Sequence, residues 1–88
     1  MIIMEENILK EKLKEDIIKT LGLHLVPSEI INDMPLFGDE GIGLDSIDAI
    51  DLVSLLENNY GVEIEDMGKG KEIIRSIDSI AAYVMKKG

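Results

Sequence analysis

Helical periodicity in the first quarter of the chain constrains the fold more strongly than any other feature. An apolar residue recurs at every fourth position, while Lys and Glu fill most positions between, and the apolar set is Leu9, Leu13, Ile17 and Leu21. This spacing is typical of an amphipathic helix of about four turns with one apolar face. Gly22 predicts the end of this helix, because glycine favours the backbone conformation of a helix C-cap.

Two further helices are predicted in the second half of the chain. One begins after Asp45 as its N-cap, has Asp48 at the third helical position, and runs to about Tyr60 before Gly61 ends it. The other begins after a cap at Ser76 or Asp78, and its spacing predicts a buried face made of Ile77, Ile80, Ala81 and Val84.

The segments between the helices are predicted to be loops. Residues 23–43 contain two prolines and three glycines, which indicates a long ordered loop with one short turn near residues 28–31. We expect this loop to be fixed to the core by Ile30, Leu36 and Phe37. Gly68 and Gly70 penalise a helix, so at most a short turn is expected around residues 71–74. The brief alternation "YGVEIE" has no partner strand.

These elements predict an all-α fold in one domain, residues 1–88. The fold is a small bundle of three main helices plus a short third-helix turn, with a long loop between the first and second main helices.

Composition excludes several classes of function. The chain has no cysteine and one histidine, so disulfides, thiolate metal sites and a Cys–His catalytic pair are ruled out, and no metal site is predicted. A net charge of -9 argues against nucleic acids and anionic membranes as partners. The start "MIIMEENILK" lacks the basic region and apolar core of a signal peptide, so we expect a cytoplasmic protein without membrane insertion. We also expect a monomer.

The negative charge is concentrated in the middle of the chain. Residues 28–66 hold eleven acids and no base, whereas residues 67–88 hold two acids and five bases. On a helical wheel of residues 46–60, the predicted core stripe is Ala49, Ile50, Val53, Leu56 and Tyr60. The opposite side carries Asp48 and Asp51 beside two aliphatic residues, Ile47 and Leu55. Such a surface suits docking of a basic partner, and the alternative is a solvated face with two ordinary exposed aliphatics.

Ser46 lies in the first turn of the second predicted helix. A serine there commonly serves local hydrogen bonding, so a capping role is one interpretation. No base lies near it in sequence and no glycine elbow surrounds it, so another protein must activate Ser46 if it reacts. A helix N-terminus favours a phosphate, although the neighbouring acids oppose one unless they serve a partner.

The run "LDSIDAIDLVSLLENNYGVEI" resembles the acyl carrier proteins, whose signature is Asp-Ser followed by Leu or Ile at the head of the second helix. The similarity extends over almost the whole chain: a first helix, a long loop, the serine, a helix that ends in an aromatic residue and Gly-Val-x-Ile, and a last helix entered through "SIDSIAAYV".

The resemblance implies a carrier and no enzyme activity. Ser46 would carry 4'-phosphopantetheine, attached from coenzyme A by a phosphopantetheinyl transferase, and the thiol of that group would hold acyl intermediates as thioesters. Asp45 and Ile47 match the residues that flank the modified serine, and Asp48, Asp51 and Glu57 match partner-facing acids; Leu55 joins this docking set from the wheel. The expected partners are a ketosynthase, an acyltransferase or acyl-activating ligase, and related enzymes of fatty acid, specialised lipid or polyketide-type biosynthesis.

Three departures from the housekeeping pattern favour a specialised stand-alone carrier. These are the lead-in "PLFGDEGIGLDSI", Ser54 where a larger apolar residue is usual, and the glycine-containing "EDMGKGKEIIRSI". The alternatives within the carrier class are a peptidyl, aryl or D-alanyl carrier. Outside it, a calcium loop in "DEGIGLDSID" fails because Leu44 and Ile50 stand where glycine and a bidentate Glu are needed. A helical interaction module in which Ser46 is a capping residue stays open.

Overall fold

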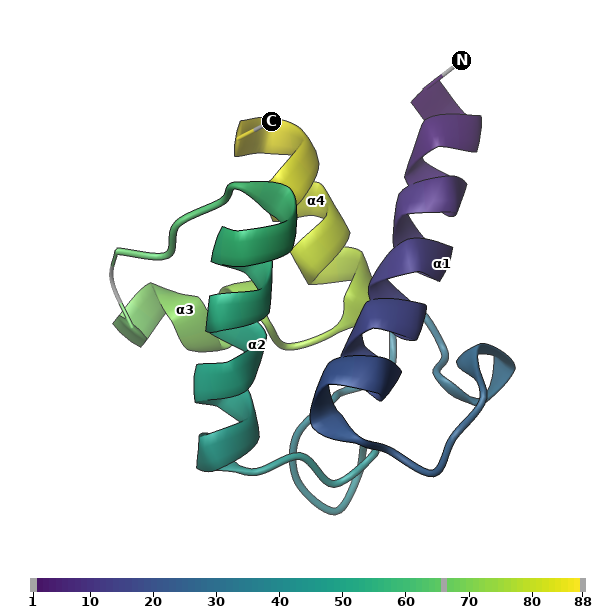
Figure 1. Cartoon of the computed structure of the whole chain (residues 1–88), viewed down its shortest axis with the longest axis vertical. Coiled ribbons are helices and arrows are strands. Elements are labelled where there is room, and N and C mark those ends of the chain that lie inside the picture. The colour runs from purple at the N-terminus through teal and green to yellow at the C-terminus, as the bar shows by residue number, and fades with distance from the viewer. Residues whose placement is uncertain (1, 66, 88) are drawn as a thin grey trace.

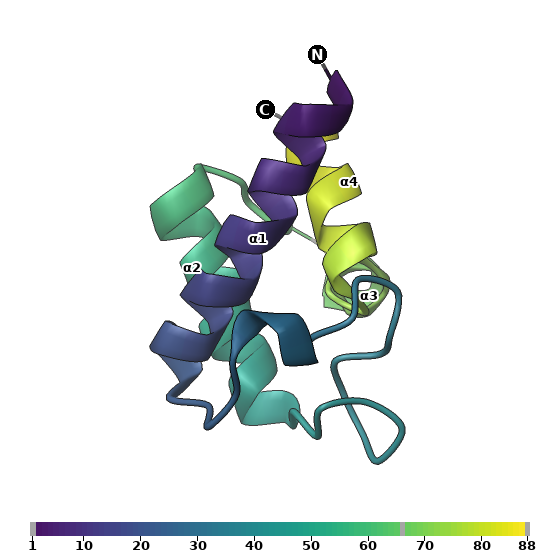
Figure 2. The same ribbon diagram turned by 90° about the vertical axis from the view of Figure 1, so that its right-hand side faces the viewer.

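The computed structural model describes residues 2–65 and 67–87, without the side chains of residues 2–5 and 67. The described residues form four α-helices and one 3-10 helix: α1 (Ile2–Leu21), η1 (Pro27–Glu29), α2 (Ser46–Tyr60), α3 (Met67–Ile73) and α4 (Ile77–Lys87). α1 runs antiparallel to α2 and α4, and the short α3 lies across them (Figure 1). Figure 2 shows the long loop at the end of the bundle where α1 ends and α2 begins. The predicted all-α bundle is confirmed.

The helix ends follow from local chemistry. α1 ends at Leu21 and α2 at Tyr60, and the glycine after each has a φ of 65°, in the left-handed region that glycine adopts without strain. α1 begins at Ile2 rather than at Leu9, so the first helix is longer than predicted. An ion pair of 2.9 Å between Lys10 Nζ and Glu6 Oε2, one turn apart, stabilises this earlier part of α1.

The core is aliphatic and draws on α1, α2, α4, the long loop and the segment that joins α3 to α4. Its fully buried large side chains are Leu13, Ile17, Ile30, Leu36, Leu52, Leu56, Ile74, Ile77 and Ile80. Burying each side chain of this size stabilises the fold by about 1.5–3 kcal/mol before entropy is counted. The predicted buried face of α4 is confirmed at all four positions, Ile77, Ile80, Ala81 and Val84.

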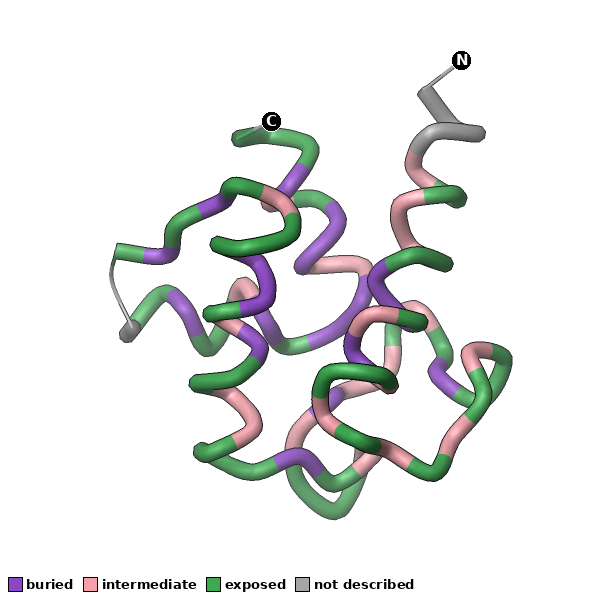
Figure 3. The backbone as a smooth tube through the Cα atoms, viewed as in Figure 1, coloured by how far each residue is buried: buried purple, intermediate pink, exposed green. Residues whose placement is uncertain are grey.

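The apolar stripe of α2 differs from the predicted one. Its buried residues are Leu52, Leu55 and Leu56, in the middle and later part of the helix (Figure 3). Leu55 is 4% exposed, so the prediction that it lies outside the core is wrong. Ile50 is 62% exposed, so its assignment to the core is also wrong. The wheel fixes angles around one helix, but the side that is covered depends on where the other elements pack, and α1 packs against α2.

The long loop is fixed to the bundle at several points. The prediction that Ile30 and Leu36 anchor it is confirmed, whereas Phe37 is only partly buried. The Leu36 N–H donates to the carbonyl of Arg75, and the Asp78 N–H donates to the carbonyl of Asn32, so the loop is bound to the segment that joins α3 to α4 and to the start of α4. The short turn expected near residues 28–31 is present as η1.

The last part of the loop is held by a β-bridge. Phe37 and Leu44 form an isolated parallel bridge, in which Leu44 N–H donates to the Leu36 carbonyl and Gly38 N–H donates to the Leu44 carbonyl. Gly41 lies so close to the Pro35 carbonyl that a Cβ at this position would stand 1.9 Å from the oxygen. This tight segment fixes Leu44, and therefore fixes where α2 begins.

α3 is longer than the single turn expected around residues 71–74, because it begins at Met67 and contains both Gly68 and Gly70. Tertiary packing offsets their low helix propensity: Gly70 is buried, Ile74 is fully buried, and α3 packs against α4. The Ile74 N–H donates to the Gly70 carbonyl over 3.0 Å, which extends the helical pattern toward α4.

Polar contacts join α1 to its neighbours. The Tyr60 hydroxyl donates to Asp16 Oδ2 over 2.6 Å between α2 and α1, and Lys10 Nζ lies 2.8 Å from Asp78 Oδ1 between α1 and α4. At the start of α4, Ser76 Oγ accepts from the Ser79 N–H and Ser79 Oγ accepts from the Ser76 N–H, so of the two predicted caps Ser76 is the one used. Within residues 2–65 and 67–87, no helix is long and apolar enough to cross a membrane.

Candidate functional site

The first turn of α2 is held by a reciprocal cap. Asp45 Oδ1 accepts from the N–H groups of Ile47 and Asp48 over 3.0 and 3.1 Å, and Asp48 Oδ2 accepts from the Asp45 N–H over 3.0 Å. The predicted capping box is therefore confirmed. Because these two N–H groups already have an internal partner, the start of α2 offers a phosphate fewer free donors than a bare helix N-terminus does.

Ser46 is the first residue of α2 and is exposed. Its side chain is free of hydrogen bonds to the rest of the described chain, since the capping bonds are made by Asp45 and Asp48. Ser46 therefore does not act as the cap. The capping interpretation gave a structural reason for a serine at this position, and the structure removes that reason. An exposed hydroxyl without an internal partner is accessible to a reagent or an enzyme.

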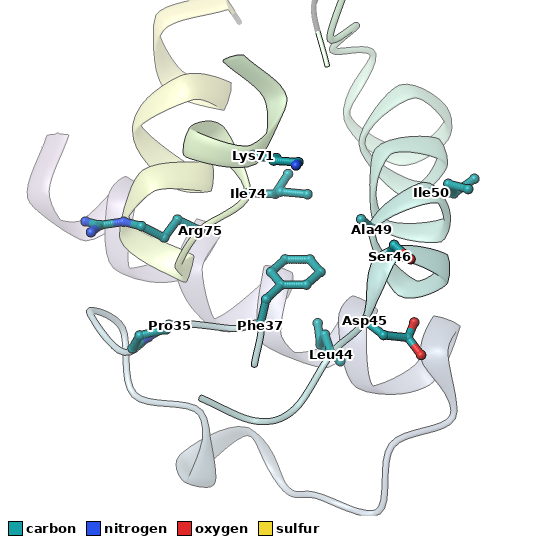
Figure 4. A pocket seen from close by; sticks show the side chains of 10 residues that line it. All are labelled: Pro35, Phe37, Leu44, Asp45, Ser46, Ala49, Ile50, Lys71, Ile74 and Arg75. Carbon is teal, nitrogen blue, oxygen red and sulfur yellow. The ribbon is translucent and has the colours of Figure 1, made fainter. Parts of the chain in front are cut away.

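A pocket of about 550 Å³ adjoins Ser46, between the start of α2, the end of the loop and the segment that joins α3 to α4 (Figure 4). Its lining is mostly apolar and includes Pro35, Phe37, Leu44, Ala49, Ile50 and Ile74. The volume lies within the usual range for small-molecule sites, about 300–1,000 Å³. An apolar chain that starts at Ser46 would find here a surface that excludes water.

Few charged residues line this pocket. Asp45 is at its edge, but its carboxylate points away from the interior, and Lys71 and Arg75 lie on the wall opposite α2 (Figure 4). Neither Lys71 nor Arg75 forms an ion pair with a carboxylate of the described residues. The part of the chain that the structure describes contains no cluster of three or more His, Cys, Asp or Glu side chains suited to a metal ion.

Comparison with known proteins identifies the family. Residues 11–84 match the family described as "Phosphopantetheine attachment site". The chain is 36% identical over 78 residues to the acyl carrier protein of Solidesulfovibrio magneticus, covering 89% of this chain and 94% of the relative. It is 31% identical over 84 residues to that of Chlorobium phaeobacteroides, covering 96% and 100%. The chain belongs to the acyl carrier protein family. A further relative, from Akkermansia muciniphila, is 29% identical over 83 residues.

Membership of the acyl carrier proteins settles the general role. The chain is a carrier and not an enzyme, and it carries acyl groups on covalently attached 4'-phosphopantetheine. Its partners accordingly include a phosphopantetheinyl transferase and acyl-processing enzymes. The resemblance drawn from "LDSIDAIDLVSLLENNYGVEI" is therefore confirmed.

The structure separates the predicted docking residues of this carrier into three groups by their exposure. Ile47 is 68% exposed, and Asp51 and Glu57 are exposed, so these residues are available to a partner. Asp48 is half-buried and takes part in the cap. Leu55 is buried in the core and is not available for docking.

Ile50 is the exposed apolar residue that the sequence analysis missed. It lies on α2 one turn after Ser46 and at the rim of the pocket. The sequence signal that could have identified Ile50 is its spacing from Ile47. Residues three apart in a helix are neighbours on one face, so Ile50 lies beside the exposed Ile47. We define the α2 docking face as Ile47, Asp48, Ile50, Asp51 and Glu57.

Proposed function

We propose that Ser46 is the residue to which 4'-phosphopantetheine is attached. The observation that carries this proposal is an exposed serine hydroxyl, without a structural hydrogen bond, beside a large apolar pocket. When bound, the group supplies a thiol, which this cysteine-free chain lacks, and the thiol holds an acyl group as a thioester. The residues around Ser46 fit such a group because the hydroxyl is accessible and the pocket is apolar.

The attachment depends on the transferase for its chemistry. The Ser46 oxygen forms a bond to the phosphorus next to pantetheine in coenzyme A, the pyrophosphate bond breaks, and the remaining nucleotide leaves. The hydroxyl proton passes to a base of the transferase, because no Lys, His or Cys lies near Ser46 in sequence and the nearest carboxylates are engaged in the cap.

The pocket beside Ser46 is the proposed place for the acyl chain. A chain that enters it removes apolar surface from water, at about 0.8 kcal/mol for each buried CH₂. Phe37, Leu44 and Ile74 would contact the chain, since all three line the pocket. A reactive thioester is thereby shielded until a partner enzyme draws the chain out.

The α2 docking face is the proposed contact surface for partner enzymes. It combines two exposed aliphatic residues with acids in a segment that has no base, so charge attracts a basic partner and apolar contact holds it. Electrostatic contacts of this kind are screened by salt and allow fast arrival and fast release. A carrier that serves several enzymes in turn needs both fast arrival at each enzyme and fast release from it.

The finer assignments rest on the sequence patterns alone. A specialised stand-alone role, in fatty acid, specialised lipid or polyketide-type biosynthesis, is supported by the loop lead-in "PLFGDEGIGLDSI" and by Ser54. Ketosynthase, acyltransferase and acyl-activating ligase partners stay predictions. So do a monomeric state, a cytoplasmic location and a single domain over residues 1–88.

The proposal is tested by incubating the apo protein with coenzyme A, Mg²⁺ and a broad-specificity phosphopantetheinyl transferase, followed by intact mass measurement. We expect the wild type to gain the mass of one phosphopantetheine and Ser46→Ala to gain none. Because Ser46 makes no hydrogen bond in the cap, Ser46→Ala should keep the wild-type Tm, which shows that the variant is folded. A full gain of mass by Ser46→Ala would refute Ser46 as the attachment residue.

A further inference from the structure

The positive charges that line the pocket beside Ser46 lie on one side only. The residues of the loop and α2 that line it are apolar apart from Asp45 and Ser46, whereas Lys71 and Arg75 contribute two positive charges on the other side. These two and Ile74 belong to the basic C-terminal segment, and the other lining residues belong to the acid-only stretch of residues 28–66. An apolar site with one or two placed charges is typical of a pocket that selects its ligand by a polar end group.

The two basic side chains are not equivalent. Lys71 extends from α3 toward α2, so that its ammonium group faces the space between the two helices, whereas the guanidinium of Arg75 points away from the pocket (Figure 4). The ammonium of Lys71 has no carboxylate partner within ion-pair distance among the described residues. The carboxylate of Asp45 accepts hydrogen bonds from the α2 backbone and points elsewhere. Lys71 is exposed to solvent, and of the two basic lining residues it is the one whose charged end points toward α2.

We propose that this pocket accepts an acyl group whose far end carries a carboxylate, and that Lys71 binds this carboxylate. The inference rests on the proposed function, because it requires the cargo to be attached through Ser46. A chain that enters from the α2 side and crosses the apolar floor of Phe37 and Ile74 meets Lys71 on the opposite wall. The cargo class is a dicarboxylic acid joined to the thiol through one of its two carboxyl groups.

The physical reason is the cost of an unpaired charge. A carboxylate placed against Phe37, Leu44 and Ile74 without a partner loses its hydration and gains nothing, whereas a charge-assisted bond to an ammonium offsets this loss. A pocket without Lys71 therefore favours chains that end in a methyl group. The phosphodiester of the arm is a second anion near the pocket, but it is present with every cargo and its effect cancels when cargoes are compared.

The test compares two series of acyl groups loaded on the full chain. The transferase and the corresponding acyl-coenzyme A thioesters are used to load monocarboxylic acyl groups and dicarboxylic acyl groups of matched carbon number and increasing length. Each product is verified by intact mass, and its Tm is measured relative to the same protein carrying the unacylated arm. This difference removes any effect of a substitution on the stability of the fold itself.

The matched variants are Lys71→Met and Arg75→Met, which remove the same charge from the same wall. In Lys71→Met we expect the Tm increment of the best dicarboxylic cargo to fall by about 2–4 °C, since Lys71 is exposed and a salt bridge at an exposed position contributes up to about 1 kcal/mol. We expect Arg75→Met to keep the wild-type increment, Lys71→Arg to keep most of it, and the increments of methyl-ended cargo to be unchanged in all three.

Two results would overturn the proposal. An unchanged dicarboxylic increment in Lys71→Met would mean that this lysine only covers apolar surface with its methylene stem. An equal loss in Arg75→Met would mean that the effect comes from net charge and not from the pocket. Failure of the wild type to gain mass at all would instead refute Ser46 as the attachment residue, and this inference with it.

Discussion

At the scale of single residues, two aliphatic residues of α2, Leu55 and Ile50, differ strongly in burial. The helical wheel placed Leu55 on the docking side and Ile50 in the core stripe. In the structure, Leu55 is 4% exposed, whereas Ile50 is 62% exposed and lies beside the pocket. Both are aliphatic and both lie in one helix. Their energetic roles should therefore differ strongly, although their chemistry is nearly the same.

We expect Leu55→Ala to lower the free energy of unfolding by about 2–5 kcal/mol, because it removes buried methyl groups and leaves a cavity. Ile50→Ala should change it by less than about 0.5 kcal/mol, as is usual for an exposed position. Urea unfolding of the apo protein, followed by circular dichroism, measures both values. Equal effects of the two substitutions would show that the assigned face of α2 is wrong.

At the scale of elements, the contact between α1 and α2 includes a half-buried hydrogen bond. The Tyr60 hydroxyl donates to Asp16 Oδ2, and Lys12 Nζ lies 5.4 Å from the centroid of the Tyr60 ring. Burial, and then the bond to Asp16, raise the pKa of Tyr60 above its ordinary value of 10.0. Its neutral form is favoured in the folded state, so this stabilisation is complete below pH 10 and is lost as the pH rises further.

Tyr60→Phe tests this link. We expect it to reduce the free energy of unfolding at neutral pH by about 1 kcal/mol, the usual net value of one hydrogen bond. Above pH 10 the wild type should lose stability more steeply than the variant, because only the wild type has a tyrosine at this position to ionise. Lys10 contributes in the same direction in both proteins, since its pKa is raised mainly by the bond to Asp78. Parallel pH profiles for the two proteins would contradict the assigned role of Tyr60.

At the scale of the whole molecule, the charges are separated along the chain and also in space. The acid-only segment of residues 28–66 includes all of α2, whereas the bases Lys86 and Lys87 lie at the far end of α4. The start of α2, with Ser46, and the end of α4 lie at opposite ends of the bundle (Figure 1). Lys86 and Lys87 are therefore far from Ser46 and oppose the approach of a basic transferase to the serine only weakly.

Reversing Asp51 and Glu57 together to Lys should slow modification of Ser46 by about 10-fold or more at low salt, with a smaller effect at high salt. These two acids are chosen because Asp48 also caps α2, and its loss would disturb the fold. The control reverses Glu63 and Glu65, two exposed acids beyond the end of α2, and so changes the net charge equally. The initial rate of mass gain at several ionic strengths measures the effect. Equal slowing by both pairs would refute a specific docking face.

The sequence by itself determined α2, α4, the end of α1, the caps of these helices and the place of Ser46 on α2, because these depend on neighbours within one turn. Asp45 and Asp48 form their capping box whatever packs nearby, and Gly22 and Gly61 end their helices through their own backbone freedom. Only the tertiary structure decided which face of α2 is buried, how far α3 extends past Gly68 and Gly70, and that Lys71 faces a pocket beside Ser46. Each of these depends on residues far apart in the chain, where packing outweighs local preference.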